Sequence, residues 1–139
     1  MKKSPSFLRL VDANYNRAKE ALRVAEDISR FLMNDARLTA AFKKVRHELT
    51  RALLHFPVSY REIVAARDSA DDVGKTGAIK DIKRKLKWSD LLISNLKRAQ
   101  EALRVLEEFA KIAAPTEAKS FQKIRFKVYE LEKICFRKL

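Results

Sequence analysis

The stretch Asn14–Asp27, with the sequence NYNRAKEALRVAED, recurs at Asn95–Glu108 as NLKRAQEALRVLEE. Nine of these fourteen positions carry the same residue at a constant offset of 81. The segments that follow also correspond, at an offset of 79, where FKKVR at 42–46 matches FQKIR at 121–125. Each unit is therefore expected to contain a helix, a short break and a second helix. The duplication predicts an all-α fold, a four-helix bundle made of two helical hairpins.

Residues that favour the start of a helix precede each long helical segment. They are Ser4-Pro5, Asn34-Asp35, Trp88-Ser89 and Pro115-Thr116. We expect long helices over roughly 5–32, 36–56, 89–114 and 116–137, and a short helix over roughly 60–66. The whole chain, 1–139, then forms a single domain: repeat 1 at about 4–56, a long connection at 57–88 and repeat 2 at about 89–138.

The composition limits the possible classes of protein. The net charge is +13, which implies an anionic partner: a nucleic acid, a phosphorylated small molecule or an acidic lipid. One cysteine excludes an internal disulfide framework, and the absence of a long apolar run or signal sequence predicts a cytoplasmic protein without a membrane partner. Because the outer faces of a duplicated bundle offer further helix packing, we also expect a homo-oligomer.

Helical spacing places polar residues of the repeat among the apolar ones. At about 100° per residue, Asn14 and Arg17 fall within the arc that holds Ala21 and Val24, and Glu20 falls on its shoulder. The second unit repeats this pattern with Asn95, Arg98 and Glu101. An arginine within an apolar stripe is unfavourable unless it is paired or faces a wet cleft.

Two interpretations of this pattern remain open. Arg17–Glu20 and Arg98–Glu101 could be buried ion pairs that set the register of the bundle. Alternatively, the polar residues of both copies line a cavity between the helices, where bundles commonly place ligand sites. In such a cavity the arginines would bind phosphate through their planar donor fork, and the carboxylates would hold a divalent cation.

The connection adds a second group of charged residues. Arg67-Asp68 is followed by Asp71-Asp72 and by Gly74-Lys75-Thr76, which suits either a phosphate-binding lid or a solvated loop. As a P-loop the segment is weak, because Ser69 stands where the first glycine should be. We assign catalytic roles to Arg17, Arg98 and Arg67, phosphate- or substrate-binding roles to Asn14, Asn95, Arg46, Arg125 and Lys75, and metal-binding roles to Glu20, Glu101, Asp68 and Asp72. His47 and His55 are interpreted as surface residues, and Cys135 as a core residue.

Three blocks of this sequence, 11–27, Arg67-Asp68 with Asp72-Val73-Gly74, and 95–108, resemble one family across nearly the whole chain. It is the small helical domain often fused ahead of thiamine-phosphate synthase. The resemblance implies a hydroxymethylpyrimidine-phosphate kinase unrelated to the ribokinase-like enzyme, using ATP with Mg²⁺. It also implies thiamine-phosphate synthase as a partner or fusion.

The implied reaction agrees with the residues present. The attacking group would be a phosphate oxygen that is already ionised at neutral pH, so no strong general base is required. Positioning and charge neutralisation by arginines, Mg²⁺ and carboxylates would carry the catalysis. Two alternatives remain: a non-catalytic module that binds the pyrimidine phosphate, and a helical nucleic-acid-binding protein that uses the basic stretch Lys80–Lys87.

Overall fold

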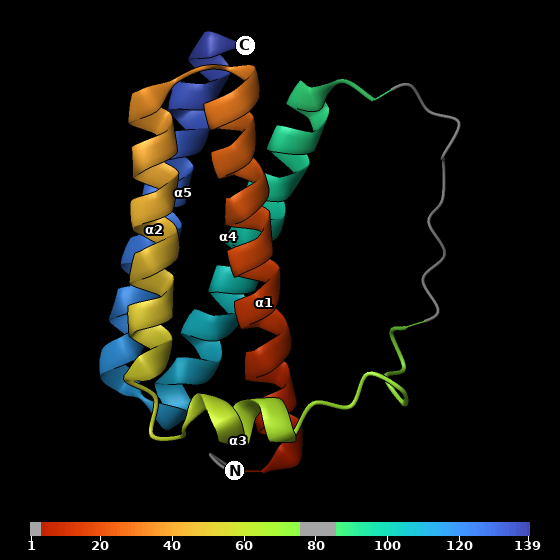
Figure 1. Cartoon of the computed structure of the whole chain (residues 1–139). Coiled ribbons are helices and arrows are strands. Elements are labelled where there is room, and N and C mark those ends of the chain that lie inside the picture. The colour runs from red at the N-terminus through yellow and green to blue at the C-terminus, as the bar shows by residue number, and fades with distance from the viewer. Residues whose placement is uncertain (1–3, 76–85) are drawn as a thin grey trace.

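The computed structural model describes residues 4–75 and 86–139, and four long helices dominate it (Figure 1). They are α1 (Pro5–Asp27), α2 (Ala36–Leu54), α4 (Trp88–Ala113) and α5 (Pro115–Lys138). A π-helical turn, η1 (Ile28–Leu32), extends α1, and the short helix α3 (Tyr60–Ala65) lies across one end of the bundle. The predicted all-α bundle and its short connecting helix are confirmed.

The two units are arranged about a pseudo-two-fold axis perpendicular to the bundle. α1 packs against α2 and α4, and α5 packs against the same two helices. Figure 1 shows that α1 and α4 run in opposite directions, as do α2 and α5. Because α1 and α4 carry the repeated sequence and run in opposite directions (Figure 1), equivalent residues lie at corresponding positions on either side of the axis.

Most of the expected helix starts are confirmed. Ser4 Oγ accepts a hydrogen bond from Phe7 N at 3.3 Å, and Asp35 Oδ1 accepts one from Leu38 N at 2.9 Å. Pro115 occupies the first turn of α5. The pair Trp88-Ser89 was expected to place the N-cap at Ser89, which was wrong, because α4 begins at Trp88 and its N-cap is Lys87.

Asp90 accounts for that earlier start. Its Oδ2 accepts a hydrogen bond from Lys87 N at 3.0 Å, which satisfies the donor that precedes the first turn of α4.

The change in repeat offset from 81 to 79 has a structural cause. Unit 1 joins its helices through three residues, 33–35, whereas unit 2 uses Ala114 alone. Asn34 in this turn has a φ of 52°, a left-handed conformation that asparagine adopts more readily than most residues. Just before it, Met33 N donates to Ile28 O at 3.0 Å, the five-residue spacing of a π turn. The predicted break at Asn34-Asp35 is confirmed.

A duplicated ion pair joins the two helices of each unit. Arg46 Nε lies 2.8 Å from Glu26 Oε2, and Arg125 Nε lies 2.8 Å from Glu107 Oε2. Both glutamates are buried, and the Glu107 carboxylate raises the pKa of Arg125 above its ordinary value. The idea that buried pairs fix the register is therefore supported for these residues. It was wrong for Arg17–Glu20 and Arg98–Glu101, because all four residues are exposed.

Replacing Glu107 with Gln leaves the Arg125 charge buried without its partner. We expect the free energy of unfolding, measured by urea denaturation followed by circular dichroism, to fall by about 3 kcal/mol. Glu108→Gln is the matched control, because Glu108 pairs with Arg104 and Lys111 at the surface and should leave the curve unchanged. Equal losses from both variants would contradict a structural role for the buried pair.

Cys135 supplies a pH-dependent test of the core. Burial raises the pKa of its thiol to about 11, and 1% of the residue is exposed. The unfolded thiol ionises near pH 8.5, whereas the folded one stays protonated, so this group favours unfolding as the pH rises above that value. At pH 9 we expect iodoacetamide to label Cys135 only at the rate of unfolding, as measured by mass spectrometry. Rapid labelling of the folded chain would contradict this.

Candidate functional site

An open pocket lies where α1 and α4 meet on the outside of the bundle. Its volume is about 410 Å³, and its lining combines two arginines, an asparagine and a carboxylate with two small apolar residues. These residues are Asn14, Arg17, Arg98, Glu101, Ala102 and Val105. The predicted convergence of both repeats on one pocket is thus present in the structure, but the pocket is an external groove rather than a buried cavity.

The expectation that Arg17 and Glu20 point into the core was wrong, because both are exposed. The reason is the size of the residues on the adjoining positions. Ala18 and Ala21 are buried in α1, and small side chains allow two helices to approach closely. The longer polar side chains are then left on the outer rim of the α1–α4 contact, where water reaches them.

The two repeated asparagines are held in the same way. Asn14 Nδ2 donates to Leu10 O at 2.9 Å, and Asn95 Nδ2 donates to Leu91 O at 2.8 Å. Each bond orients the amide and leaves its Oδ1 without a hydrogen-bond partner among the described residues. Asn14 is buried and lines the pocket. It therefore offers a fixed acceptor at the base of the groove.

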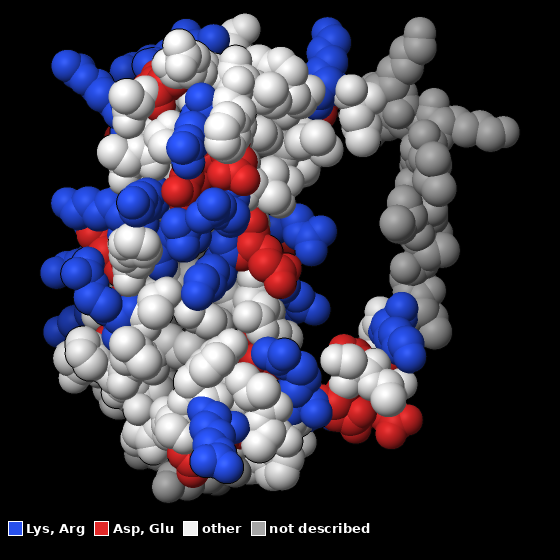
Figure 2. Space-filling model, viewed as in Figure 1, with Lys and Arg blue, Asp and Glu red and all other residues white. Residues whose placement is uncertain are grey.

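A larger pocket of about 750 Å³ adjoins the first one along α1. It is enclosed by α1 and by the segment 67–73, and it shares Asn14 and Arg17 with the smaller pocket. Its remaining charged or amide-bearing residues are Arg9, Asp12, Asn16, Arg67, Asp68 and Asp72. Figure 2 shows the acidic side chains grouped where this segment leaves α3. Arg17 stands between the two pockets.

An ion pair fastens the segment 67–73 to α1. Arg67 Nε and Nη2 donate to the two oxygens of Asp12 at 2.7 and 2.8 Å, the paired geometry that suits a guanidinium and a carboxylate. Asp12 is buried and raises the pKa of Arg67. Asn16 Nδ2 also donates to Asp12 Oδ1 at 3.1 Å, and Arg9 Nη2 donates to Asp68 O at 3.3 Å. Arg67 therefore shapes the pocket while two of its donors are already occupied.

Asp12 was missed in the sequence analysis. Its equivalent in the second unit is Ile93, so the repeat does not mark this position as polar. The position of Asp12 in the sequence could have indicated that it is buried, because it lies between Val11 and Tyr15, two apolar residues that the helix buries. A buried carboxylate requires a cationic partner, and Arg67 provides it.

The four predicted metal-binding residues do not form one cluster. Asp68 and Asp72 line the larger pocket, Glu101 lines the smaller one, and Glu20 lines neither. Among residues 4–75 and 86–139, no three histidine, cysteine or carboxylate side chains are placed to hold a metal ion together. Asp68 Oδ1 accepts from Asp71 N and Asp72 Oδ1 accepts from Gly74 N. Their second oxygens have no hydrogen-bond partner among the described residues, so these two carboxylates are the ones in the larger pocket that could ligate a cation.

Several other predicted residues lie elsewhere. Arg46 and Arg125 are engaged with Glu26 and Glu107 and line neither of the two pockets. Asn95 and Lys75 do not line them either. Most of the basic stretch Lys80–Lys87 lies outside the described residues, as does the end of the predicted Gly-Lys-Thr lid.

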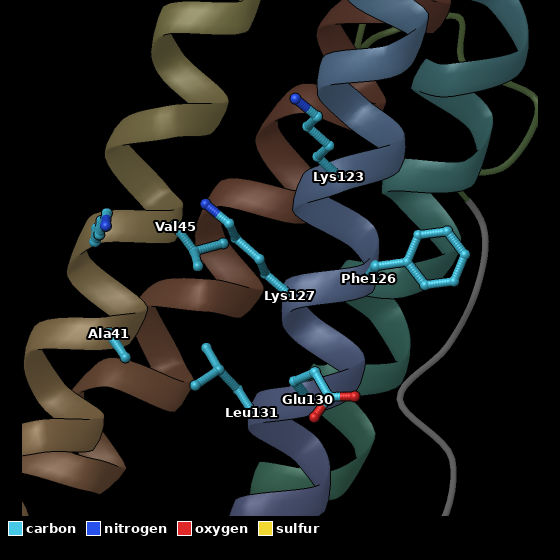
Figure 3. Close-up of a pocket in the computed structure, with 8 residues that line it drawn as sticks. Ala41, Val45, Lys123, Phe126, Lys127, Glu130 and Leu131 are labelled. Atoms are coloured by element: carbon cyan, nitrogen blue, oxygen red, sulfur yellow. The ribbon is translucent and has the colours of Figure 1, made fainter.

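A second hollow, on the opposite face, lies between α2 and α5 (Figure 3). It has a volume of about 470 Å³ and a mostly apolar lining that includes Ala41, Val45 and Leu131. Lys127 points toward α2 in Figure 3 and pairs with Glu48 at 2.8 Å. This hollow lacks the oriented asparagine and the two facing arginines, so the α1–α4 groove is the better candidate site.

The groove and the duplicated bundle define a class: an all-helical protein with an arginine-lined groove between its two repeated helices. Comparison with known proteins makes this more specific. The model of the ThiD2 family matches residues 9–134, and the chain belongs to this family. No solved structure matches the chain.

The relatives at the sequence level are proteins named thiamine-phosphate synthase. The one from Nostoc punctiforme is 39% identical over 124 residues, covering 89% of this chain and 34% of the relative. Those from Rhodopirellula baltica and Synechocystis are 35% and 37% identical, covering 91% and 93% of this chain and 33% and 36% of the relatives. The chain thus spans about a third of the length of these relatives. The family and these relatives associate it with thiamine biosynthesis.

Removing the Asp12 charge should release the segment 67–73 from α1. We expect Asp12→Asn to increase amide hydrogen exchange over 67–75, measured by mass spectrometry, because Arg67 loses its buried partner. Asp27→Asn serves as the control, since Asp27 forms an exposed pair with Arg23 on the same helix. Unchanged exchange in Asp12→Asn would show that other contacts hold the segment.

Proposed function

We propose that the chain is an ATP-dependent kinase that converts hydroxymethylpyrimidine phosphate to the diphosphate in thiamine biosynthesis. The observation that carries the proposal is the position of Arg17, on the wall shared by two adjoining pockets. A phosphoryl transfer between two phosphorylated substrates needs two such pockets and a cation where they meet. Membership of the ThiD2 family supports the link to the thiamine pathway.

The chemistry requires little proton transfer. A phosphate oxygen of the pyrimidine phosphate attacks the γ-phosphorus of ATP, the bond to the β–γ bridging oxygen breaks, and ADP leaves with those electrons. The attacking oxygen is already ionised at neutral pH, so the enzyme needs no strong general base. His47 and His55 are exposed and line neither pocket, in agreement with this.

The chain's own residues supply positioning and charge. Arg17 and Arg98 face each other across the groove and would bind the phosphate oxygens, whose charge is spread over several atoms in the transition state. Mg²⁺ would enter on ATP and neutralise its phosphates, with Asp68 and Asp72 as its protein ligands. Neither Arg17 nor Arg98 has an ion-pair partner among the described residues, so both are available for this role.

The relatives suggest how the product is used. Proteins named thiamine-phosphate synthase contain a segment like this chain together with about twice its length of further sequence. We propose that the diphosphate made at this groove passes to such a synthase, as a fused domain or as a separate partner.

An assay of ADP release with hydroxymethylpyrimidine phosphate, ATP and Mg²⁺ tests the proposal. We expect turnover by the wild-type chain and a decrease in kcat/KM of at least about 100-fold for Arg17→Ala, with the fold retained because Arg17 is exposed. Arg23→Ala is the matched control, since Arg23 is equally exposed but lines neither pocket.

The other outcomes separate the alternatives. A folded chain that binds the pyrimidine phosphate without turnover would be a binding module. Absence of binding to either substrate, together with tight and steeply salt-dependent binding to RNA or DNA, would instead identify a nucleic-acid-binding protein.

A further inference from the structure

The two pockets that share Arg17 differ in size and chemistry, and the difference assigns one substrate to each. We infer that the smaller pocket holds the pyrimidine phosphate and the larger one holds the Mg²⁺–nucleotide. This inference rests on the proposed function and adds the arrangement of the substrates within it. It also distinguishes two glutamates, Glu20 and Glu101, that the sequence repeat makes equivalent.

The volumes agree with this assignment. The smaller pocket measures about 410 Å³ and the larger about 750 Å³. The acceptor consists of one substituted ring and one phosphate, whereas the donor carries a base, a ribose and three phosphates. Pockets that bind small molecules generally enclose most of the ligand surface, so the larger donor requires the larger pocket.

The lining of the smaller pocket matches the acceptor. Ala102 and Val105 form an apolar surface for the ring and its methyl group. Glu101 has no ion-pair or hydrogen-bond partner among the described residues, and its carboxylate can accept from the amino group on the ring. Arg98 and Arg17 line the same pocket and would bind the phosphate.

The lining of the larger pocket matches a nucleotide with its metal. Asp68 and Asp72 each keep one carboxylate oxygen that no described residue binds, which suits a Mg²⁺ held mainly by phosphates. Arg9 lies in the same pocket and adds a positive charge for the phosphate chain. The smaller pocket contains one carboxylate, whereas the larger one contains Asp68 and Asp72 in addition to the paired Asp12, so the smaller pocket is less suited to the metal.

The lining residues of the smaller pocket are repeated in the sequence of the other unit, whereas several of those that line the larger pocket are not. Every residue of the smaller pocket has an identical equivalent in the other unit: Asn95, Arg98, Arg17, Glu20, Ala21 and Val24. The larger pocket has no such counterpart, because Arg9, Asp12 and Asn16 correspond to Asp90, Ile93 and Lys97.

The donor can therefore approach from only one side of Arg17. Glu101 lies in the pocket beside the donor site, whereas Glu20 lies in neither pocket. The acceptor phosphate and the γ-phosphate then meet at Arg17, from the two pockets that share it.

Isothermal titration calorimetry with one ligand at a time tests this arrangement. The ligands are hydroxymethylpyrimidine phosphate alone, and Mg²⁺ with a non-hydrolysable ATP analogue. We expect Glu101→Ala to weaken binding of the pyrimidine phosphate by about 10-fold or more while the affinity for the analogue is unchanged. Asp72→Asn should show the opposite selectivity, and Arg17→Ala should weaken both.

Two variants serve as matched controls. Glu20→Ala removes the equivalent glutamate from the side without a nucleotide pocket, and Asp71→Asn removes an exposed carboxylate beside Asp72 that does not line the pocket. Neither should alter either affinity. An effect of Glu20→Ala as large as that of Glu101→Ala, or loss of the nucleotide rather than the pyrimidine in Glu101→Ala, would overturn the inference.

Calorimetry and the ADP-release assay together test the assignment of the pockets separately from the proposed kinase function. Selective binding as expected, but without ADP release, would support the two sites and contradict the kinase. Turnover with the reversed selectivity would support the kinase and contradict the assignment of the pockets. A wild-type chain that binds neither ligand would contradict both.

Discussion

The close contact between α1 and α4 governs the rest of this structure. Each helix buries two alanines midway along its length: Ala18 and Ala21 in α1, Ala99 and Ala102 in α4. The helices can therefore lie near each other, and the larger side chains beside the alanines are displaced to the rim. Arg17 and Arg98 occupy that rim on opposite sides of the pseudo-two-fold axis. A single packing constraint thus creates a groove that carries two arginines without an ion-pair partner among the described residues.

The duplication has been preserved unevenly. Inside each unit, the glutamate–arginine pairs Glu26–Arg46 and Glu107–Arg125 share the same Nε–Oε2 contact at 2.8 Å, and a buried charge that loses its partner destabilises the fold. On the outside, the units have diverged. Asp12 has become a buried anchor for Arg67 in unit 1, whereas Ile93 occupies the same position in unit 2. A symmetric scaffold therefore supports an asymmetric pair of pockets.

The connection between the units contributes to the site through its first residues. Arg67 and Asp68 are fastened to α1 by contacts with Asp12 and Arg9, so the segment forms a wall of the larger pocket although it has no regular secondary structure there. Loops of this length inside a compact domain commonly carry function. In this chain the wall brings two carboxylates, Asp68 and Asp72, beside the arginine of the groove.

The sequence by itself determined the helical class, the duplication and most of the helix boundaries, because these depend on local periodicity and capping. It also identified Asn14, Arg17, Arg98 and Glu101 as one group, since the repeat made them visible. The tertiary structure alone decided that Arg17 lies on a rim rather than in the core. A helical wheel assumes one buried stripe, whereas α1 contacts two helices and its alanines set how near they come. The tertiary structure also paired Arg46 and Arg125 with glutamates and Arg67 with Asp12. These are contacts between distant segments that no local pattern specifies.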